Sequence, residues 1–150
     1  MTQLLNYLMG FLTAILAIYV KKSIDDKDLR RRSLFALINE AQNNLAVLEK
    51  TARVYLLTTI AWDTMHSYLA EKETDLFARL SEFYSAVNLR NNVMMLHNTA
   101  SCLGRISRVE VDGYVFSGEW LDHNADQLKR DAREVLGQLN ERLSQLADCP

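Results

Sequence analysis

Proline, glycine and cysteine are all scarce in this sequence: there is one proline, and there are five glycines and two cysteines among 150 residues. Because proline breaks helices, its near absence favours a helical protein and leaves no room for a proline-rich linker. The two cysteines, Cys102 and Cys149, form no CxxC pair, which argues against a disulfide framework and a zinc site. A hydrophobic content of 49% excludes a low-complexity disordered chain.

Charged side chains are absent from the first twenty residues, which read MTQLLNYLMGFLTAILAIYV. Twenty helical residues span about 30 Å, the thickness of the hydrocarbon core of a bilayer. A cleaved signal peptide would need basic residues before the apolar run, whereas here Lys21 and Lys22 follow it. A buried helix of a soluble domain is the remaining alternative. The sequence therefore predicts a transmembrane anchor over residues 1–20.

A basic segment, KKSIDDKDLRRR, occupies residues 21–32 and contains six basic side chains and three aspartates. Basic residues beside a membrane helix stay on the cytoplasmic side, which predicts an external N-terminus and a cytoplasmic domain over residues 33–150. The same side chains can contact anionic lipid headgroups, although the aspartates weaken that attraction. The candidate membrane-surface residues are Lys21, Lys22, Lys27, Arg30, Arg31 and Arg32.

Small and weakly polar residues recur along one face of the predicted anchor, at i, i+4, i+7 and i+11. Such a stripe lets two membrane helices approach closely and form hydrogen bonds with each other. It suggests an interface inside the membrane with a second copy of the chain or with another membrane protein. The alternative is a chance distribution, since glycine and threonine are common in membrane helices. The residues of this stripe are Asn6, Gly10, Thr13 and Ala17.

The remaining sequence predicts an all-α domain. Apolar residues recur at heptad-like steps of three and four residues, and the expected long helices cover 25–52, 74–103 and 118–147. A shorter helix is expected over 60–70 with Thr59 as its N-cap, and Ser117 is expected to cap the last helix. We expect an antiparallel bundle closed at one end by the short helix. Whether the anchor continues into the first long helix is open, because no helix breaker separates them.

Residues 106–116 have a different pattern from the helices. Asp112-Gly113 stands between β-branched and aromatic residues, which is a signal for a hairpin. An isolated two-stranded hairpin is marginal in water, so an irregular loop is the favoured interpretation and the hairpin is the alternative.

Asparagines cluster on two of the predicted helices. A buried asparagine in a bundle fixes register or oligomeric state when its amide finds partners. The sequence therefore suggests a polar network or a docking face, with a solvated helix face as the alternative. The candidate residues are Asn44, Asn91 and Asn98.

Catalytic motifs are missing from the sequence: it has no GxSxG elbow and no glycine-rich phosphate loop. Two spaced pairs could bind a metal ion or transfer protons, namely Asp63 with His66 and Glu119 with His123. A single DxxH supplies two ligands at most, and surface or capping roles explain these pairs more simply. We therefore expect no cofactor, no metal ion and no small-molecule substrate. The acidic balance of residues 33–150, with sixteen acidic and eleven basic side chains, also argues against nucleic acid.

About a third of the chain resembles a pattern of uncharacterised prokaryotic single-pass membrane proteins with helical domains. This pattern has N-x-x-L on one helix, a Thr-Ala-Trp-like helix start, and a long helix with Leu, Tyr and a trailing Asn. The resemblance implies a helical fold beside one membrane helix and implies no activity. The matching residues here are Asn44, Leu48, Thr59, Ala61, Trp62, Leu80, Tyr84 and Asn91.

Together these features predict a non-enzymatic accessory or scaffold subunit that is anchored in the membrane and contacts a membrane protein complex through its helices. One alternative is a membrane-tethered sensor in a signalling or defence system. The other is a small helical metal protein or enzyme that uses the two spaced pairs described above. The sequence leaves the identity of the partner, the oligomeric state and the pathway open.

Overall fold

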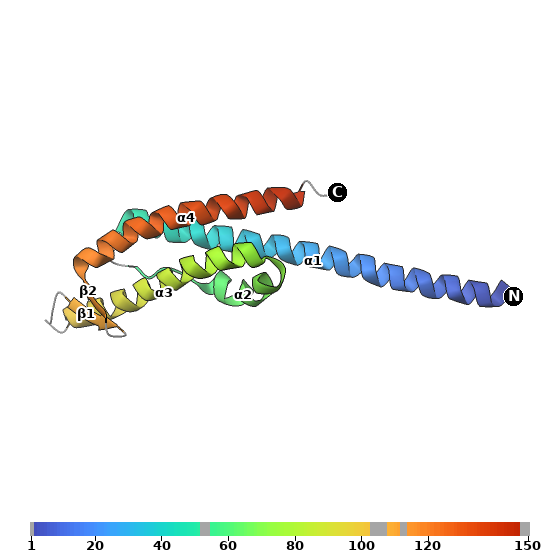
Figure 1. The fold of residues 1–150 in the computed structure, drawn as a ribbon, viewed down its shortest axis with the longest axis horizontal. Coiled ribbons are helices and arrows are strands. Elements are labelled where there is room, and N and C mark those ends of the chain that lie inside the picture. Colours follow the sequence, from blue (N-terminus) through green and yellow to red (C-terminus); the bar gives the residue numbers. More distant parts are fainter. Residues whose placement is uncertain (1, 52–54, 103–107, 112–113, 148–150) are drawn as a thin grey trace.

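The computed structural model describes residues 2–51, 55–102, 108–111 and 114–147. Side chains are described from Leu12 onward, except those of residues 14, 51, 101, 102 and 108, so both cysteines lie outside the described side chains. The described part is mostly helical, which confirms the all-α prediction, and a small hairpin is added to it. In chain order the elements are α1 (Thr2–Thr51), α2 (Ile60–Lys72), α3 (Thr74–Cys102), β1 (Arg108–Val111), β2 (Tyr114–Ser117) and α4 (Gly118–Ala147) (Figure 1).

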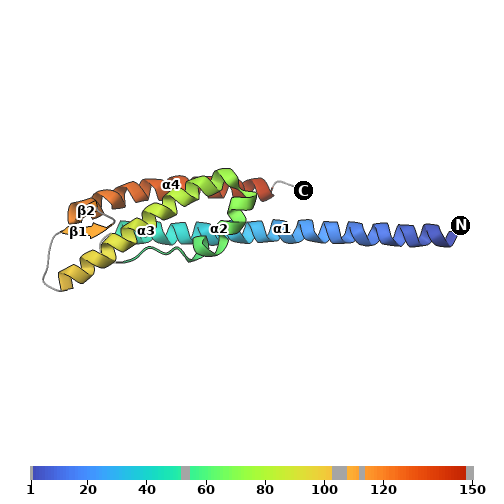
Figure 2. The ribbon, with the colours of Figure 1, turned by 60° about the horizontal axis from the view of Figure 1, so that its bottom comes forward.

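Helix α1 passes without interruption from the predicted anchor through the basic segment into the bundle. Its 50 residues correspond to a length of about 75 Å. Figures 1 and 2 show its N-terminal half extending alone beyond the other helices, which pack against its C-terminal half. The continuity has a simple cause, because residues 11–51 contain neither proline nor glycine.

Helix α2 runs back along α1 toward the basic segment. Successive contacts between the two helices establish this direction: Ala61 with Glu40, Met65 with Ser33, and Tyr68 with Asp26. The chain then turns at Glu73 and continues as α3, which runs parallel to α1 (Figure 1).

Helix α4 runs antiparallel to both α1 and α3. Arg79 of α3 pairs with Glu134 at 3.6 Å, and Arg133 of α4 pairs with Glu49 of α1 at 2.9 Å. The expected antiparallel arrangement thus holds for α4, whereas α1 and α3 are parallel because segment 55–59 and α2 together return the chain. The bundle has two ends: a corner end near Glu73, where α1 projects outward, and a hairpin end near β1 and β2 (Figure 2).

The main core lies between the C-terminal half of α1, α3 and α4, and α2 covers one side of it. The apolar residues of α4 recur as predicted along one stripe. Its first six members are buried and its last two, Leu143 and Leu146, are partly buried; the buried members are Leu121, Ala125, Leu128, Ala132, Val135 and Leu139. Of these α4 residues, those from Ala125 to Leu139 belong to the main core, whereas Leu121 belongs to a second cluster. The buried members of the main core from the other long helices include Leu34, Leu37, Ile38 and Leu48 of α1 and Leu76, Leu80, Phe83, Tyr84 and Val87 of α3.

Strands β1 and β2 form the hairpin that the sequence offered only as an alternative to a loop. They pair antiparallel, with Val109 opposite Phe116 and Val111 opposite Tyr114. A lone hairpin would be marginal, but Phe116 is buried with residues of α3 and α4 in a second apolar cluster. This packing, which is invisible to local sequence reasoning, explains why the hairpin replaces the favoured loop. The expected turn at residues 112–113 lies outside the described residues.

The starts of two helices are fixed in different ways. Ser117 caps α4 as predicted, because its Oγ accepts a hydrogen bond from the Trp120 N–H at 3.3 Å. Thr59 occupies the N-cap position of α2, but its hydroxyl donates to Asp63 instead of capping the helix. The cap comes from Glu40 of α1, whose carboxylate accepts hydrogen bonds from the N–H groups of Ala61 at 2.8 Å and Trp62 at 3.2 Å. A carboxylate at this position also interacts favourably with the helix dipole.

Candidate functional site

The described side chains of α1 that precede the basic segment form an exposed apolar surface. Every described side chain from Leu12 to Val20 is exposed, including Leu16 at 67%, Ile18 at 68% and Tyr19 at 75%. An exposed apolar surface of this extent marks an interaction with another protein or with a membrane. Of the predicted interface stripe, Thr13 and Ala17 are exposed, whereas the side chains of Asn6 and Gly10 lie outside the described residues.

Among the side chains that the structure describes, which begin at Leu12, no helix contains an apolar stretch long enough to cross a membrane.

The basic segment separates into exposed residues and residues that have partners within the bundle. Lys21, Lys22 and Arg32 are exposed to solvent. Arg31 places its guanidinium 5.9 Å from the ring centre of Phe35. Arg30, which the sequence suggested as a membrane-surface residue, instead forms an ion pair with Glu73. Arg30 is therefore only partly exposed, whereas the other five candidate residues of the basic segment are exposed.

Glu73 connects three helices at the corner end of the bundle. It is only 5% exposed and lies at the turn between α2 and α3. Its carboxylate pairs with Arg30 of α1 and lies 3.9 Å from Nε of Arg142 of α4. A buried carboxylate needs such partners, because removing it from water is unfavourable. This ion-pair cluster holds the corner against α1 at the point where α1 leaves the bundle.

Asn44 and Asn91 hold the segment 55–59 from opposite sides. The amide of Asn44 donates to the Thr58 carbonyl at 2.8 Å and accepts from the Thr58 N–H at 2.7 Å. The amide of Asn91 makes the same pair of bonds with Leu57, at 2.8 and 2.9 Å. We call these two asparagines the asparagine clasp. Each amide substitutes for a neighbouring strand, because it binds both backbone groups of one residue.

The third asparagine of the predicted set behaves differently. Asn98 is exposed on α3 and takes no part in the asparagine clasp. Its position continues the apolar stripe of α3, but the stripe leaves the main core before it reaches residue 98. The sequence therefore grouped two structural residues with one surface residue.

An aromatic stack joins α2 to α3 beside Glu40. The rings of Trp62 and Tyr84 are nearly parallel, with centres 5.0 Å apart, and Phe77 stacks on Trp62 at 5.5 Å. Tyr84 is fully buried. Burial and the nearby Glu40 carboxylate together raise the pKa of the Tyr84 hydroxyl well above its ordinary value.

Tyr84 makes the folded protein sensitive to alkali. The folded state keeps its phenol protonated while the unfolded state ionises near pH 10, so this contribution to stability is complete below about pH 10 and declines above it. We expect the free energy of unfolding to fall by up to about 1.4 kcal/mol per pH unit above about pH 10 because of this group alone. Denaturant unfolding of the full chain in mild detergent, at about pH 8 and about pH 11, measures this fall.

The matched variants isolate the contribution of Tyr84. Tyr84→Phe should lose less stability between the two pH values than the unmodified chain, whereas Tyr114→Phe, at a position 71% exposed, should behave like the unmodified chain. Equal losses in the unmodified chain and Tyr84→Phe would contradict the assignment.

Arg90 is a fully buried cation near the hairpin end. Its Nη1 donates to the carbonyl of Leu121 at 3.1 Å, which ties α3 to the first turn of α4. Burial lowers the pKa of Arg90, and the Asp122 carboxylate opposes that shift. Sequence reasoning missed Arg90, Glu73 and Glu40, although Arg90 stands between Val87 and Met94 on an apolar stripe, which is itself a signal.

The four residues of the metal-protein alternative do not come together. His66 directs Nδ1 to the carbonyl of Asp63 at 3.0 Å, on the exposed face of α2. Glu119 and His123 lie at the start of α4, near the hairpin end (Figure 1). Within the described residues, no group of three or more His, Cys, Asp or Glu side chains is arranged to hold a metal ion.

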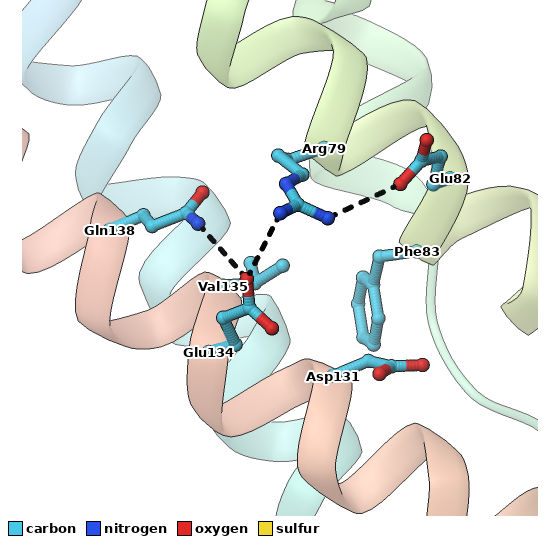
Figure 3. A pocket seen from close by; sticks show the side chains of 7 residues that line it. All are labelled: Arg79, Glu82, Phe83, Asp131, Glu134, Val135 and Gln138. Carbon is cyan, nitrogen blue, oxygen red and sulfur yellow. Dashed lines mark hydrogen bonds and ion pairs between the residues drawn. The ribbon is translucent and has the colours of Figure 1, made fainter.

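A small hollow lies between α3 and α4, as Figure 3 shows. Its volume is about 130 Å³, below the range of about 300–1,000 Å³ that small-molecule sites occupy. Phe83 and Val135 line the hollow together with charged and polar side chains. The guanidinium of Arg79 lies between two carboxylates, 3.7 Å from that of Glu82 and 3.6 Å from that of Glu134. The Arg79–Glu134 pair joins the two helices, and with the small volume it fits a packing seam rather than a binding site.

Comparison of the chain with protein-family models, with curated proteins and with solved structures found no match.

Proposed function

We propose that this protein is a single-pass membrane protein whose helical bundle serves as a scaffold for a partner in a membrane complex. The observation that carries the proposal is that residues 2–20 of α1 contain no charged side chain and that every described side chain from Leu12 to Val20 is exposed. Apolar side chains such as Leu16 and Ile18 are exposed there, and a bilayer would cover them. The proposed membrane span is the whole segment Met1–Val20, which contains no charged residue.

The orientation follows from the residues after this span. Lys21 and Lys22 are exposed immediately beyond Val20, and basic flanks stay on the cytoplasmic side. The proposed topology places the N-terminus outside and the bundle in the cytoplasm. Because α1 is continuous, the bundle is joined to the span by helix and not by a flexible linker.

The scaffold part of the proposal rests on exposed apolar side chains at the hairpin end of the bundle. Leu89 and Leu96 share one face of α3 and are 37% and 45% exposed. On the hairpin, Tyr114 and Val115 are 71% and 64% exposed. Apolar side chains of this kind at the end of the domain away from α1's projecting half suit contact with a protein partner.

The test has one part for each half of the proposal. The full chain in native membranes should resist extraction by alkaline carbonate and should require detergent for release. A photo-crosslinking residue at position 96 should give a defined adduct of higher mass, whereas the same residue at exposed position 140 on α4 should not. A chain released without detergent would refute the membrane anchor, and identical crosslinking from both positions would refute a specific contact at α3.

A further inference from the structure

A groove lies where α1 leaves the bundle. It has a volume of about 670 Å³, within the range of small-molecule sites. One wall is the face of α1 from Ile18 to Leu29, and the other side is the end of α2 at Lys72. The residues that line it are Ile18, Tyr19, Lys22, Ser23, Asp25, Asp26, Leu29 and Lys72.

The groove changes from apolar to charged along the axis of α1. Ile18 and Tyr19 form its outer end, and the charged residues lie nearer to the bundle. The rise from Ile18 to Leu29 is about 16 Å. In the proposed membrane topology the hydrocarbon ends near Val20, and the headgroup layer beyond it is about 5–7 Å thick. Lys22 and Asp25 then lie at the depth of the headgroups, while Tyr19 lies at the boundary that aromatic residues prefer.

The charges that line the groove are balanced. Lys22 and Lys72 are cationic, and Asp25 and Asp26 are anionic. Among the described residues, Lys22 and Asp25 have no ion-pair or hydrogen-bond partner. A purely anionic ligand would meet two carboxylates here and a purely cationic ligand two ammonium groups. A ligand that carries both charges fits this arrangement best.

Tyr68 orients one of the carboxylates. Its hydroxyl donates to the Asp26 backbone carbonyl at 3.3 Å and lies 3.4 Å from Oδ1 of the Asp26 carboxylate. Partial burial and the Asp26 charge raise the pKa of this hydroxyl, so it remains a donor at neutral pH. The carboxylate of Asp26 is thereby held against α2 at the edge of the groove.

We propose that this groove binds the headgroup of a zwitterionic phospholipid that carries a primary ammonium group. The inference rests on the membrane topology proposed above. The phosphate of the lipid lies between Lys22 and Lys72, and its ammonium group donates to Asp25 and Asp26. A primary ammonium has N–H donors for these carboxylates, whereas a quaternary choline group has none. The acyl chains follow Ile18 and Tyr19 into the hydrocarbon.

Native mass spectrometry of the full chain, released from detergent micelles with added phosphatidylethanolamine, phosphatidylcholine or phosphatidylglycerol, tests this assignment. Phosphatidylethanolamine should be retained about three- to five-fold more than phosphatidylcholine, in line with one or two exposed charge-assisted contacts. Asp25→Asn should weaken that preference, because it removes one of the two carboxylates that accept from the ammonium group. Lys72→Gln should lower the retention of both lipids without changing their ratio, because both carry the phosphate. Lys50→Gln, at the other end of the bundle, should change neither. Equal retention of the ethanolamine and choline lipids would overturn the proposal, as would preferential retention of phosphatidylglycerol.

Alkaline carbonate extraction of the same variants separates this inference from the proposed function. All three variants should stay in the membrane fraction, because none of them alters residues 1–20. If the chain stays in the membrane and lipid retention shows no preference, the groove assignment fails alone. If the unmodified chain is extracted without detergent, the proposed function fails, and the groove assignment fails with it.

Discussion

Replacing Leu12 and Ile15 with lysine should release the chain from membranes. Both side chains are exposed on the projecting half of α1, at 52% and 41%, and both lie within the proposed span. Exchanging an apolar residue for lysine in a membrane helix disfavours insertion by about 3–4 kcal/mol, so the pair should disfavour it by about 6–8 kcal/mol. The fraction of chain that alkaline carbonate extracts measures this change.

A matched pair of lysines outside the span tests whether membrane retention depends on where the apolar residues lie or only on how many of them the chain has. Tyr114→Lys and Val115→Lys remove two exposed apolar side chains from the hairpin, outside the proposed span. This pair should leave the chain in the membrane fraction, and circular dichroism should show that both doubly substituted chains keep their helix content. If alkaline carbonate extracted the two doubly substituted chains to the same extent, the membrane assignment would be wrong.

The spread of exposed apolar side chains around α1 bears on whether a bilayer or a protein partner covers this helix. A partner helix would contact only one stripe of α1, so lysines elsewhere on its circumference would be tolerated. A bilayer contacts every side. At about 100° per residue, Leu12 and Ile15 lie about 60° apart around the helix. Ile18 lies about 120° from Leu12 on one side and Val20 about 80° from it on the other, and all four side chains are exposed. Exposure on several faces therefore favours lipid.

Most of the helices could be predicted from the sequence, because their signals are local. The stripe from Leu121 to Leu139 repeats at steps of three and four residues, and the structure buries each member. Ser117 caps α4 for the same local reason. The sequence could not decide whether α1 is continuous. It contains no helix breaker between the predicted anchor and the bundle, but this does not exclude a turn at that point.

The features that sequence reasoning missed depend on contacts between distant residues. Glu40 caps α2 from a different helix, 21 positions before Ala61. Glu73 is buried only because Arg30 and Arg142 converge on it. The hairpin is stable because Phe116 packs against α3 and α4, and residues 106–116 alone could not reveal that. Each case requires the arrangement of the helices first, and no local pattern encodes that arrangement.

The asparagines also show the difference between what local sequence indicates and what distant contacts decide, and they lead to a prediction. Asn44 and Asn91 are structural residues because segment 55–59 passes between them. Asn44→Ala should lower the free energy of unfolding by about 2–4 kcal/mol, because it removes two backbone contacts of Thr58 and opens a buried space. Asn98→Ala, on the exposed part of α3, should change it by less than about 0.5 kcal/mol. Denaturant unfolding of the full chain in mild detergent compares the two variants.

Two further variants test the clasp itself rather than the loss of a side chain. Asn44→Asp keeps the shape but replaces the donor with an oxygen that faces the Thr58 carbonyl, so it should destabilise the fold although little volume is lost. Asn44→Ala combined with Asn91→Ala should lose less than the sum of the single losses, because releasing segment 55–59 once forfeits both pairs of bonds. Strict additivity would mean that the two asparagines stabilise the fold independently and that no common segment links them.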